Sequence, residues 1–311
     1  MKVLLTGASG FLGQYVLRLL QQSNIAVVAV GRSRPPGLTQ RSAESGFIPV
    51  DLLALNDLFP LVQQVGATHL LHLAWVTEHG QYWTSPLNFR WVDASTRLVQ
   101  AFCEAGGQHV VGVGSCAEYL WGNGVCSEAT TPLTPSTVYG VAKDATRRLL
   151  EALCAHYKVR CAWGRVFFPF GAGEGPARLL PKLVEVLQGR AAPFGVGTLA
   201  YRDFLHAQDV ASGLLALLQS DASGSYNISS SHPLQIGELV RVVAQLLGQD
   251  PACVLDCSSE RVAQPSALVG DSQKLEALGW RPQLTLLQGL EKTLRDASAL
   301  PSKQKEDAHD A

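Results

Sequence analysis

The first 22 residues constrain the fold more than any other part of the chain. The apolar run Val3–Thr6 predicts a strand, and the amphipathic stretch Phe11–Gln22 predicts a helix. Between them lies the turn Gly7-Ala8-Ser9-Gly10-Phe11-Leu12-Gly13. Its glycines permit a tight turn, close approach of a pyrophosphate to the backbone, and close packing of the helix on the strand. Because a helix N-terminus attracts phosphate, the sequence predicts a dinucleotide-binding turn.

Short apolar runs then alternate with longer helical patterns through the first half of the chain. Further strands are predicted at Ile25–Val30, Phe47–Val50, His69–Ala74, Val110–Gly114 and Val159–Val166. The main helices between them are predicted at Pro86–Ala105 and Val138–Tyr157. This alternation predicts an α/β fold, a doubly wound parallel sheet of the Rossmann type. We assign residues 1–165 to this domain.

The pattern becomes less regular after residue 166, which predicts a smaller, mixed α+β domain for substrate binding. Phe167–Gly175 is expected to be a loop, and Leu199–Leu205 and Tyr226–Ile228 are expected to be strands. Helices are predicted at Pro176–Gln188, from Asp209, and at Ile236–Leu247, Ser272–Leu278 and Leu284–Arg295. This domain takes residues 166–301, with some chain returning to the first domain, and residues 302–311 form a polar tail expected to be disordered.

Composition excludes several classes of protein. The formal net charge is -1, which gives no attraction to nucleic acid or to a membrane surface. No apolar stretch approaches the roughly 20 residues that a membrane span needs, and the glycine turn leaves no room for a cleavable leader. The seven cysteines show no Cys-x-x-Cys spacing, so we expect reduced thiols, no metal site and a cytoplasmic protein.

The residues that follow the second strand bear on the choice of cofactor. A carboxylate at this position binds the ribose 2′-hydroxyl of NAD, whereas arginine accommodates a 2′-phosphate. The chain has Gly31-Arg32-Ser33-Arg34 here, with no acidic residue. We therefore expect Arg32 and Arg34 to favour NADP(H) over NAD(H).

Ser115, Tyr139 and Lys143 form a second pattern with chemical meaning. Tyr139 and Lys143 are four residues apart in a predicted helix, so they share one face. A nearby ammonium favours the phenolate and is expected to lower the pKa of Tyr139, which would pass a proton to or from a carbinol oxygen. Ser115, at the end of a predicted strand, can hydrogen-bond the same oxygen. The three residues predict hydride-transfer chemistry beside the cofactor.

Together these motifs resemble those of the extended short-chain dehydrogenase/reductases, in the branch of NAD(P)-dependent nucleotide-sugar epimerases, dehydratases and reductases. Thr6–Gly13 matches the family's glycine turn, and Ser115, Tyr139 and Lys143 match its catalytic residues. Further matches are Arg165–Gly171, Arg202-Asp203-Phe204-Leu205-His206 with Asp209, and Leu278-Gly279-Trp280-Arg281-Pro282. The resemblance covers nearly the whole chain, from Val3 to about Leu294.

The resemblance implies roles for individual residues. The cofactor is expected to contact Gly7, Ser9, Gly10, Phe11, Leu12, Gly13, Arg32, Arg34, Asp51, Leu52, Leu73, Ala74, Tyr139, Lys143 and Phe168. The substrate is expected to contact Ser115, Arg202 and Arg261, where the arginines bind the diphosphate of a sugar nucleotide. The alternatives are an ion pair of Arg202 with Asp203 or Asp209, and a solvated loop arginine at Arg261.

Other positions of the resemblance carry structural expectations. Asp209 is expected to cap the following helix. His72 and His206 are expected to be packed or structural, because tyrosine already fills the proton-transfer role. The helices Pro86–Ala105 and Val138–Tyr157 occupy positions where family members often pair as homodimers, although their sequences leave the oligomeric state open.

Departures from the family pattern point to one branch. Dehydratases carry an aspartate and a glutamate directly after the catalytic hydroxyl residue, whereas this chain has Cys116 and Ala117, and Glu118 comes one place late. The absence of an acid at Gly31 favours a reductase that exchanges NADPH, acting on a 4-keto-6-deoxy sugar nucleotide. The alternatives are a nucleotide-sugar 4-epimerase, a reductase of isoprenoid, flavonoid or steroid carbonyls, and a non-catalytic NADP(H)-binding sensor.

Overall fold

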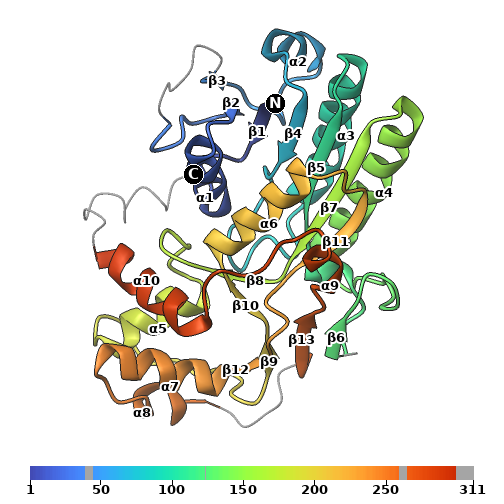
Figure 1. Ribbon diagram of the computed structural model, residues 1–311. Coiled ribbons are helices and arrows are strands. Elements are labelled where there is room, and N and C mark those ends of the chain that lie inside the picture. Colours follow the sequence, from blue (N-terminus) through green and yellow to red (C-terminus); the bar gives the residue numbers. More distant parts are fainter. Residues whose placement is uncertain (39–44, 123, 259–264, 299–311) are drawn as a thin grey trace.

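The structure is a computed structural model that describes residues 1–38, 45–122, 124–258 and 265–298. Figure 1 shows a large sheet flanked by helices, built mostly from the first half of the chain, and a smaller region of short strands and helices built mostly from the second. Arg261 and the tail at residues 302–311 lie outside the described residues.

Seven parallel strands form the large sheet. They are β1 (Lys2–Thr6), β2 (Ala26–Gly31), β3 (Gly46–Pro49), β4 (His69–His72), β5 (His109–Ser115), β7 (Arg160–Val166) and β11 (Gly224–Ile228). Their order is β11-β7-β5-β4-β1-β2-β3, so the direction of winding reverses between β1 and β4. Ligands of such sheets bind in the crevice outside the carboxyl ends of the strands at this reversal. The glycine turn follows β1 directly and therefore lies at this crevice.

Helices cover both faces of the large sheet, as Figure 1 shows. One face is covered by α1 (Phe11–Gln22) and α6 (Ala207–Gln219), and the other by α2 (Phe59–Val65), α3 (Leu87–Glu104) and α4 (Val138–Tyr157). Each face has its own apolar core, because strands buried on both faces present apolar side chains to both layers of helices. Among the helices of the described residues, none is long and apolar enough to cross a membrane.

The smaller region contains two short sheets and several helices. Its strands are β6 (Gly124–Cys126), β8 (Phe168–Phe170), β9 (Tyr201–Arg202), β10 (Phe204–His206), β12 (Leu234–Gln235) and β13 (Ala267–Gly270). Four of them pair in the order β12-β9-β13-β6, and β10 pairs with β8. The helices are α5 (Leu179–Leu187), α7 (Ile236–Leu247), α8 (Ala252–Leu255), α9 (Gln273–Glu276) and α10 (Leu286–Ser298). Apolar residues of α5, α7, α8 and α10 share a separate core around Leu183, Val240 and Leu290.

The two regions exchange segments of chain. Strand β6 comes from the first half of the sequence but pairs with β13 in the smaller region. Strand β11 comes from the second half but pairs with β7 at the edge of the large sheet. The chain therefore crosses the boundary between the regions several times, and β6 lies between Ser115 at the end of β5 and Tyr139 at the start of α4.

Long elements match the predictions better than short ones. Helices α1, α4 and α7 begin and end at the predicted residues. The predicted strand Leu199–Leu205 is instead divided into β9 and β10 at Asp203, whose carboxylate accepts the backbone N–H groups of Ser230, Ser231 and Gly270. The predicted loop Phe167–Gly175 contains β8, whose few residues are held by pairing with β10. Such short strands have little signal of their own, because tertiary pairing stabilises them.

Candidate functional site

The glycine turn has the geometry of a phosphate-binding loop. Helix α1 begins at Phe11 after Gly10, and no side chain caps its first turn. A Cβ atom on Gly13 would lie 1.9 Å from the carbonyl oxygen of Gly7. Only glycine at position 13 therefore lets the helix approach the turn this closely. Leu73 and Ala74, which the resemblance assigns to the loop along the cofactor's linker, are also near the turn, since Thr6 Oγ1 accepts their N–H groups, both at 3.1 Å. These residues fit a dinucleotide pyrophosphate at the uncapped N-terminus of α1.

The residues after β2 and β3 surround the place where such a turn positions the adenosine. Arg32 and Arg34 follow β2 directly, and both side chains are exposed. Among the described residues neither has an ion-pair partner, so both guanidinium groups are available to an anion. Asp51 is exposed and accepts the N–H of Leu53 at 3.0 Å, and the neighbouring Leu52 is buried.

Ser115, Tyr139 and Lys143 come together from two elements. Ser115 ends β5, and the two other residues lie one turn apart in the first turns of α4. The helix is capped by Thr137, whose hydroxyl accepts the N–H of Gly140 at 3.0 Å. A Cβ atom on Gly140 would lie 2.2 Å from the carbonyl oxygen of Ala117. Glycine here therefore lets α4 pack against the short helix η1 (Cys116–Glu118), which brings the phenol of Tyr139 to Ser115.

The environment of Tyr139 favours the protonated phenol. Burial raises the pKa of Tyr139 and the nearby Tyr82 raises it further, while a hydrogen bond with Ser115 opposes the increase. We predicted from the sequence that Lys143 lowers this pKa, and the direction found is the opposite. The physical reason is that desolvation of the phenolate outweighs the favourable contacts in a largely enclosed site. Tyr139 therefore holds its proton at neutral pH, as a proton donor must.

Lys143 is fixed by contacts that the sequence did not suggest. Its Nζ donates a hydrogen bond to the carbonyl oxygen of Val113 at 2.9 Å and lies 3.8 Å from the centre of the Trp75 ring. The same Nζ is 6.0 Å from the centre of the Tyr139 ring. Burial lowers the pKa of Lys143 to about 7, and the carboxylate of Glu118 opposes this effect. The amino group is held at the base of the site by an aromatic face and a carbonyl dipole, both of which favour its protonated form.

Aromatic side chains line the site beside Tyr139. The Tyr82 and Trp83 rings meet the Tyr139 ring edge to face, with centroids 4.8 and 5.7 Å away. Trp83 also meets Trp121 edge to face at 5.9 Å. Sequence reasoning missed this wall, although the cluster of aromatic residues between positions 75 and 83 was a visible signal. The wall gives the site an apolar surface that the ring of a sugar can pack against.

Arg202 is a buried cation without a carboxylate partner among the described residues. Its Nη1 donates to the carbonyl oxygens of Tyr201 at 2.7 Å and Pro265 at 2.9 Å, and burial lowers its pKa. The guanidinium lies 5.6 Å from the centre of the Phe168 ring. The alternative interpretation, an ion pair with Asp203 or Asp209, has no support in the described residues. A buried guanidinium that is incompletely neutralised suits an anionic ligand.

Asp209 does not have the capping role predicted for it. The N-cap of α6 is His206, whose Nδ1 accepts the N–H of Gln208 at 3.1 Å. The Asp209 carboxylate instead accepts the N–H groups of Gln283 at 3.0 Å and Leu284 at 3.2 Å, and so holds the chain that leads into α10. The carboxylate points to this chain because the imidazole of His206 already occupies the end of the helix.

His72 has the structural environment that was expected. Its two ring nitrogens contact the hydroxyls of Thr6 and Ser95, both at 2.8 Å. Burial lowers the pKa of this imidazole to about 3, with a smaller contribution from Lys143, so it stays neutral. It links the glycine turn to α3.

The loop after β8 adds two charged groups that the sequence did not single out. Burial raises the pKa of Glu174 to about 8, and Arg178 opposes the increase. The guanidinium of Arg178 lies 5.5 Å from the centre of the Tyr82 ring and hydrogen-bonds its side chain. These groups therefore extend the site from the aromatic wall into the smaller region.

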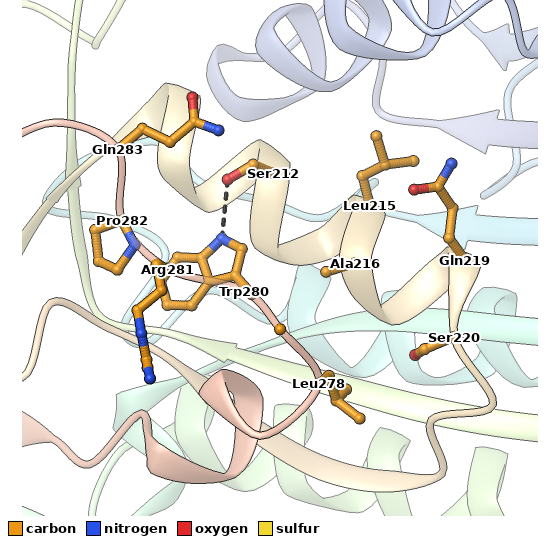
Figure 2. Close-up of a pocket in the computed structure, with 11 residues that line it drawn as sticks. Ser212, Leu215, Ala216, Gln219, Ser220, Leu278, Trp280, Arg281, Pro282 and Gln283 are labelled. Carbon is orange, nitrogen blue, oxygen red and sulfur yellow. Dashed lines mark hydrogen bonds between the residues drawn. The ribbon is translucent and has the colours of Figure 1, made fainter.

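A separate groove lies against α6, on the face of the large sheet that α1 and α6 cover. Figure 2 shows its lining, in which Trp280 donates a hydrogen bond from Nε1 to Ser212 Oγ at 2.9 Å. The groove has a volume of about 490 Å³ and is formed by α6 and residues 278–283. None of the predicted site residues lines it. The Leu278–Pro282 motif thus packs the C-terminal segment on α6 and does not form the site.

The arrangement after Ser115 differs from the acidic pair expected of dehydratases. Cys116 and Ala117 are both buried, and neither side chain supplies a carboxylate to the site. Glu118 turns back under Ser115, where its Oε1 accepts the Ser115 N–H at 2.8 Å and its Oε2 pairs with Arg165 at 2.7 Å. The site thus combines one protonated phenol, one hydroxyl and one lysine beside a dinucleotide turn. This set suits hydride transfer to or from a carbinol carbon.

Known proteins resemble the chain in both sequence and fold. The model of the NAD dependent epimerase/dehydratase family matches residues 3–229. The dTDP-D-glucose 4,6-dehydratase of Mus musculus is 23% identical over 314 residues, covering 94% of this chain and 87% of the relative. The GDP-6-deoxy-D-mannose reductase of Pseudomonas aeruginosa is 29% identical over 192 residues, covering 56% of this chain and 62% of the relative.

A solved structure of MoeE5 in complex with UDP-glucose and NAD superposes with a TM-score of 0.83 at 28% identity, covering 96% of this chain and 99% of that chain. Its likeness extends over both regions of the fold. The relatives are nucleotide-sugar dehydratases, epimerases and reductases of the extended short-chain dehydrogenase/reductase type. The glycine turn, the Ser115–Tyr139–Lys143 arrangement and these matches agree, and the chain belongs to the NAD dependent epimerase/dehydratase family.

Proposed function

We propose that the protein is an NADPH-dependent reductase of a nucleotide-activated 4-keto-6-deoxy sugar. The observation that carries this proposal is the pair of exposed, unneutralised arginines, Arg32 and Arg34, directly after β2. Two guanidinium groups suit a 2′-phosphate, and no carboxylate stands there to bind the 2′-hydroxyl of NAD. NADPH suits a net reduction, because cells keep this cofactor for reductive steps and the oxidised form must leave after each turnover.

Three residues divide the catalytic work. A nicotinamide held beside the glycine turn would supply the hydride for the keto carbon. Tyr139 donates its phenolic proton to the oxygen of that carbon, and its raised pKa keeps the proton available at neutral pH. Ser115 orients the carbonyl by hydrogen-bonding the same oxygen, and Lys143 supplies positive charge that stabilises the tyrosinate left behind. The product is the corresponding alcohol with the oxidised cofactor.

The substrate's nucleotide portion is assigned to the smaller region. Arg202 lies beside Phe168 and has no carboxylate partner among the described residues, which suits it to a diphosphate. The reductase of Pseudomonas aeruginosa, named for a GDP-6-deoxy sugar, supports this class of substrate. The aromatic wall of Tyr82, Trp83 and Trp121 offers apolar contacts to a sugar ring and to its 6-methyl group.

The second candidate is a nucleotide-sugar 4-epimerase that keeps NAD bound. The family match itself favours it, as does the MoeE5 structure, which holds NAD with UDP-glucose. Tyr139, assisted by Ser115 and Lys143, would then take the proton of the 4-hydroxyl and later give it back to the same oxygen. The hydride of C4 would pass to NAD and would return to the other face of the sugar. The two candidates differ in whether cofactor is consumed.

The test uses a panel of 4-keto-6-deoxy sugars, and of sugars with a hydroxyl at C4, each activated with UDP, GDP or dTDP. Stoichiometric loss of NADPH absorbance identifies the reductase, and exchange of sugar isomers without net oxidation identifies the epimerase. Tyr139→Phe removes the proton donor but keeps the ring contacts with Tyr82 and Trp83, so turnover should fall by about 10²- to 10⁴-fold.

The matched control is Tyr157→Phe, which removes a phenol at the other end of the same helix, where its hydroxyl contacts Glu104. This variant should keep wild-type turnover. Both variants should bind NADPH normally by fluorescence titration. Wild-type turnover in Tyr139→Phe would remove Tyr139 from the mechanism.

A further inference from the structure

A fully buried carboxylate lies directly beneath the proposed catalytic serine. Glu118 has no solvent exposure, and its Oε1 accepts the backbone N–H of Ser115 at 2.8 Å. The indole Nε1 of Trp163 donates to the same oxygen at 2.9 Å. The other oxygen, Oε2, pairs with Nε of Arg165 at 2.7 Å, and this guanidinium is only 1% exposed. The two side chains that donate to this carboxylate, Trp163 and Arg165, are therefore enclosed by protein.

The ion pair of Glu118 and Arg165 is linked to the neighbouring strand β11 through further buried groups. Arg165 Nη1 donates to the hydroxyl of Tyr119 at 3.1 Å, and this hydroxyl donates to Oδ1 of Asn227 at 2.7 Å. Asn227 belongs to β11, and its Nδ2 donates to the carbonyl oxygens of Cys126 and Asp271. The network thus connects the end of β5 with β7, β11 and the smaller region.

The same network determines how Ser115 presents its hydroxyl. Ser115 Oγ accepts the N–H of Ala117 at 3.2 Å, while Glu118 accepts the N–H of Ser115, and together these contacts form a capping box at η1. One lone pair of the serine oxygen is thereby occupied. The O–H and the other lone pair remain for Tyr139 and for a substrate oxygen.

Stability alone does not account for such a pair. Desolvating two charges is expensive, and well-packed apolar residues in the place of a buried ion pair are often equally stable or more so. The carboxylate does, however, accept the backbone N–H of Ser115, and an apolar residue at position 118 could not hold the serine in this way. We propose that Glu118, held by Arg165 and Trp163, is a positioning residue that fixes Ser115 against Tyr139. This inference rests on the proposed function, because it assigns the role through the catalytic serine.

The first test is Glu118→Gln. Its amide keeps one acceptor but places a donor NH2 among the donors of Trp163, Arg165 and Ser115, so the serine loses its fixed orientation. We expect kcat to fall by about 10- to 100-fold, as for displacements of a catalytic group on the order of 1 Å. KM and the dissociation constant for NADPH should stay within about twofold, because neither ligand touches Glu118.

A double-mutant cycle with Ser115→Ala separates positioning from a general structural role. If Glu118 acts through the hydroxyl of Ser115, Glu118→Gln should cause no further loss of kcat in the Ser115→Ala protein. Equal fractional losses in both backgrounds would overturn the proposal. Trp163→Phe deletes one donor to Glu118 and leaves the ion pair with Arg165. It should lower kcat by a smaller factor, again only when Ser115 is present. This variant replaces Glu118→Gln in the cycle if the Glu118→Gln protein does not fold.

The matched control is Asp209→Asn, which alters another fully buried carboxylate that accepts two backbone N–H groups, those of Gln283 and Leu284 in the chain leading to α10. Its melting temperature should fall while kcat stays at the wild-type value. The cycle is measured with whichever reaction the wild type performs, reduction or epimerisation, since both use Ser115. Absence of both reactions in the wild type would refute the proposed function, whereas wild-type kcat in Glu118→Gln would refute only the role of Glu118.

Discussion

At the scale of single residues, two guanidinium groups after β2 decide the proposed cofactor preference. A charge-assisted hydrogen bond to a phosphate is worth about 1.5–3 kcal/mol, so losing one weakens binding by about 10- to 100-fold. Arg32→Ala should therefore raise the dissociation constant of NADPH by this factor and change that of NADH by less than about twofold. Fluorescence titration of both cofactors measures the effect. Arg281→Ala, at an exposed arginine beside the groove of Figure 2, is the control and should change neither constant. Equal loss for both cofactors would contradict the 2′-phosphate contact.

At the scale of elements, the fit of α1 on β1 depends on the absence of a side chain at position 13. A methyl group on Gly13 would lie 1.9 Å from the carbonyl oxygen of Gly7 and 2.8 Å from Cα of Ala8, both backbone atoms. Gly13→Ala must therefore push the helix away from the strand. We expect a loss of about 1–3 kcal/mol in the free energy of unfolding, as for other overpacked sites, together with weaker cofactor binding.

Denaturant unfolding monitored by circular dichroism measures the loss at Gly13. The control is Gly46→Ala in β3, where a new Cβ atom meets nothing within 4 Å, and its stability should stay within about 0.5 kcal/mol of the wild type. A Gly13→Ala protein as stable as this control would contradict the prediction, because the helix would then move away from the strand with no loss in the free energy of unfolding.

At the scale of the whole molecule, several large apolar side chains on α3 and α4 are exposed to solvent. Phe89 on α3 and Val141 and Leu149 on α4 are 60%, 48% and 43% exposed, and the two helices lie side by side along one edge of the molecule in Figure 1. We expect this face to pair with a second copy. Light scattering after size exclusion should report a dimer, and Leu149→Glu should convert it to a monomer.

The matched control for the dimer is Leu287→Glu on α10, an exposed leucine in the smaller region. It introduces the same charge and should leave the dimer intact. A monomeric wild-type protein at micromolar concentration would contradict the expectation. The candidate residues Tyr139 and Lys143 lie in the first turns of α4, so Leu149→Glu is expected to dissociate the dimer while retaining activity.

The local sequence pattern was sufficient to predict the elements whose geometry depends on residues close together in the chain. The strand, the glycine turn and α1 are contiguous, and the three glycines determine the geometry through steric effects between near neighbours. The spacing of Tyr139 and Lys143 likewise follows from one helix, which begins and ends where its pattern predicts. Short strands such as β6 and β13 could not be predicted, because three or four residues carry almost no periodicity and pair only with distant segments.

The sequence by itself therefore determined the fold family, and it predicted the dinucleotide turn and the candidate residues Ser115, Tyr139 and Lys143, since each motif depends on residues close together in the chain. Tertiary structure alone decided the electrostatics of the site. Burial raises the pKa of Tyr139, Lys143 lies over Trp75, and Glu118 turns under Ser115 to meet Arg165. Desolvation and ion pairing depend on which distant segments enclose a group, and no local pattern records that enclosure.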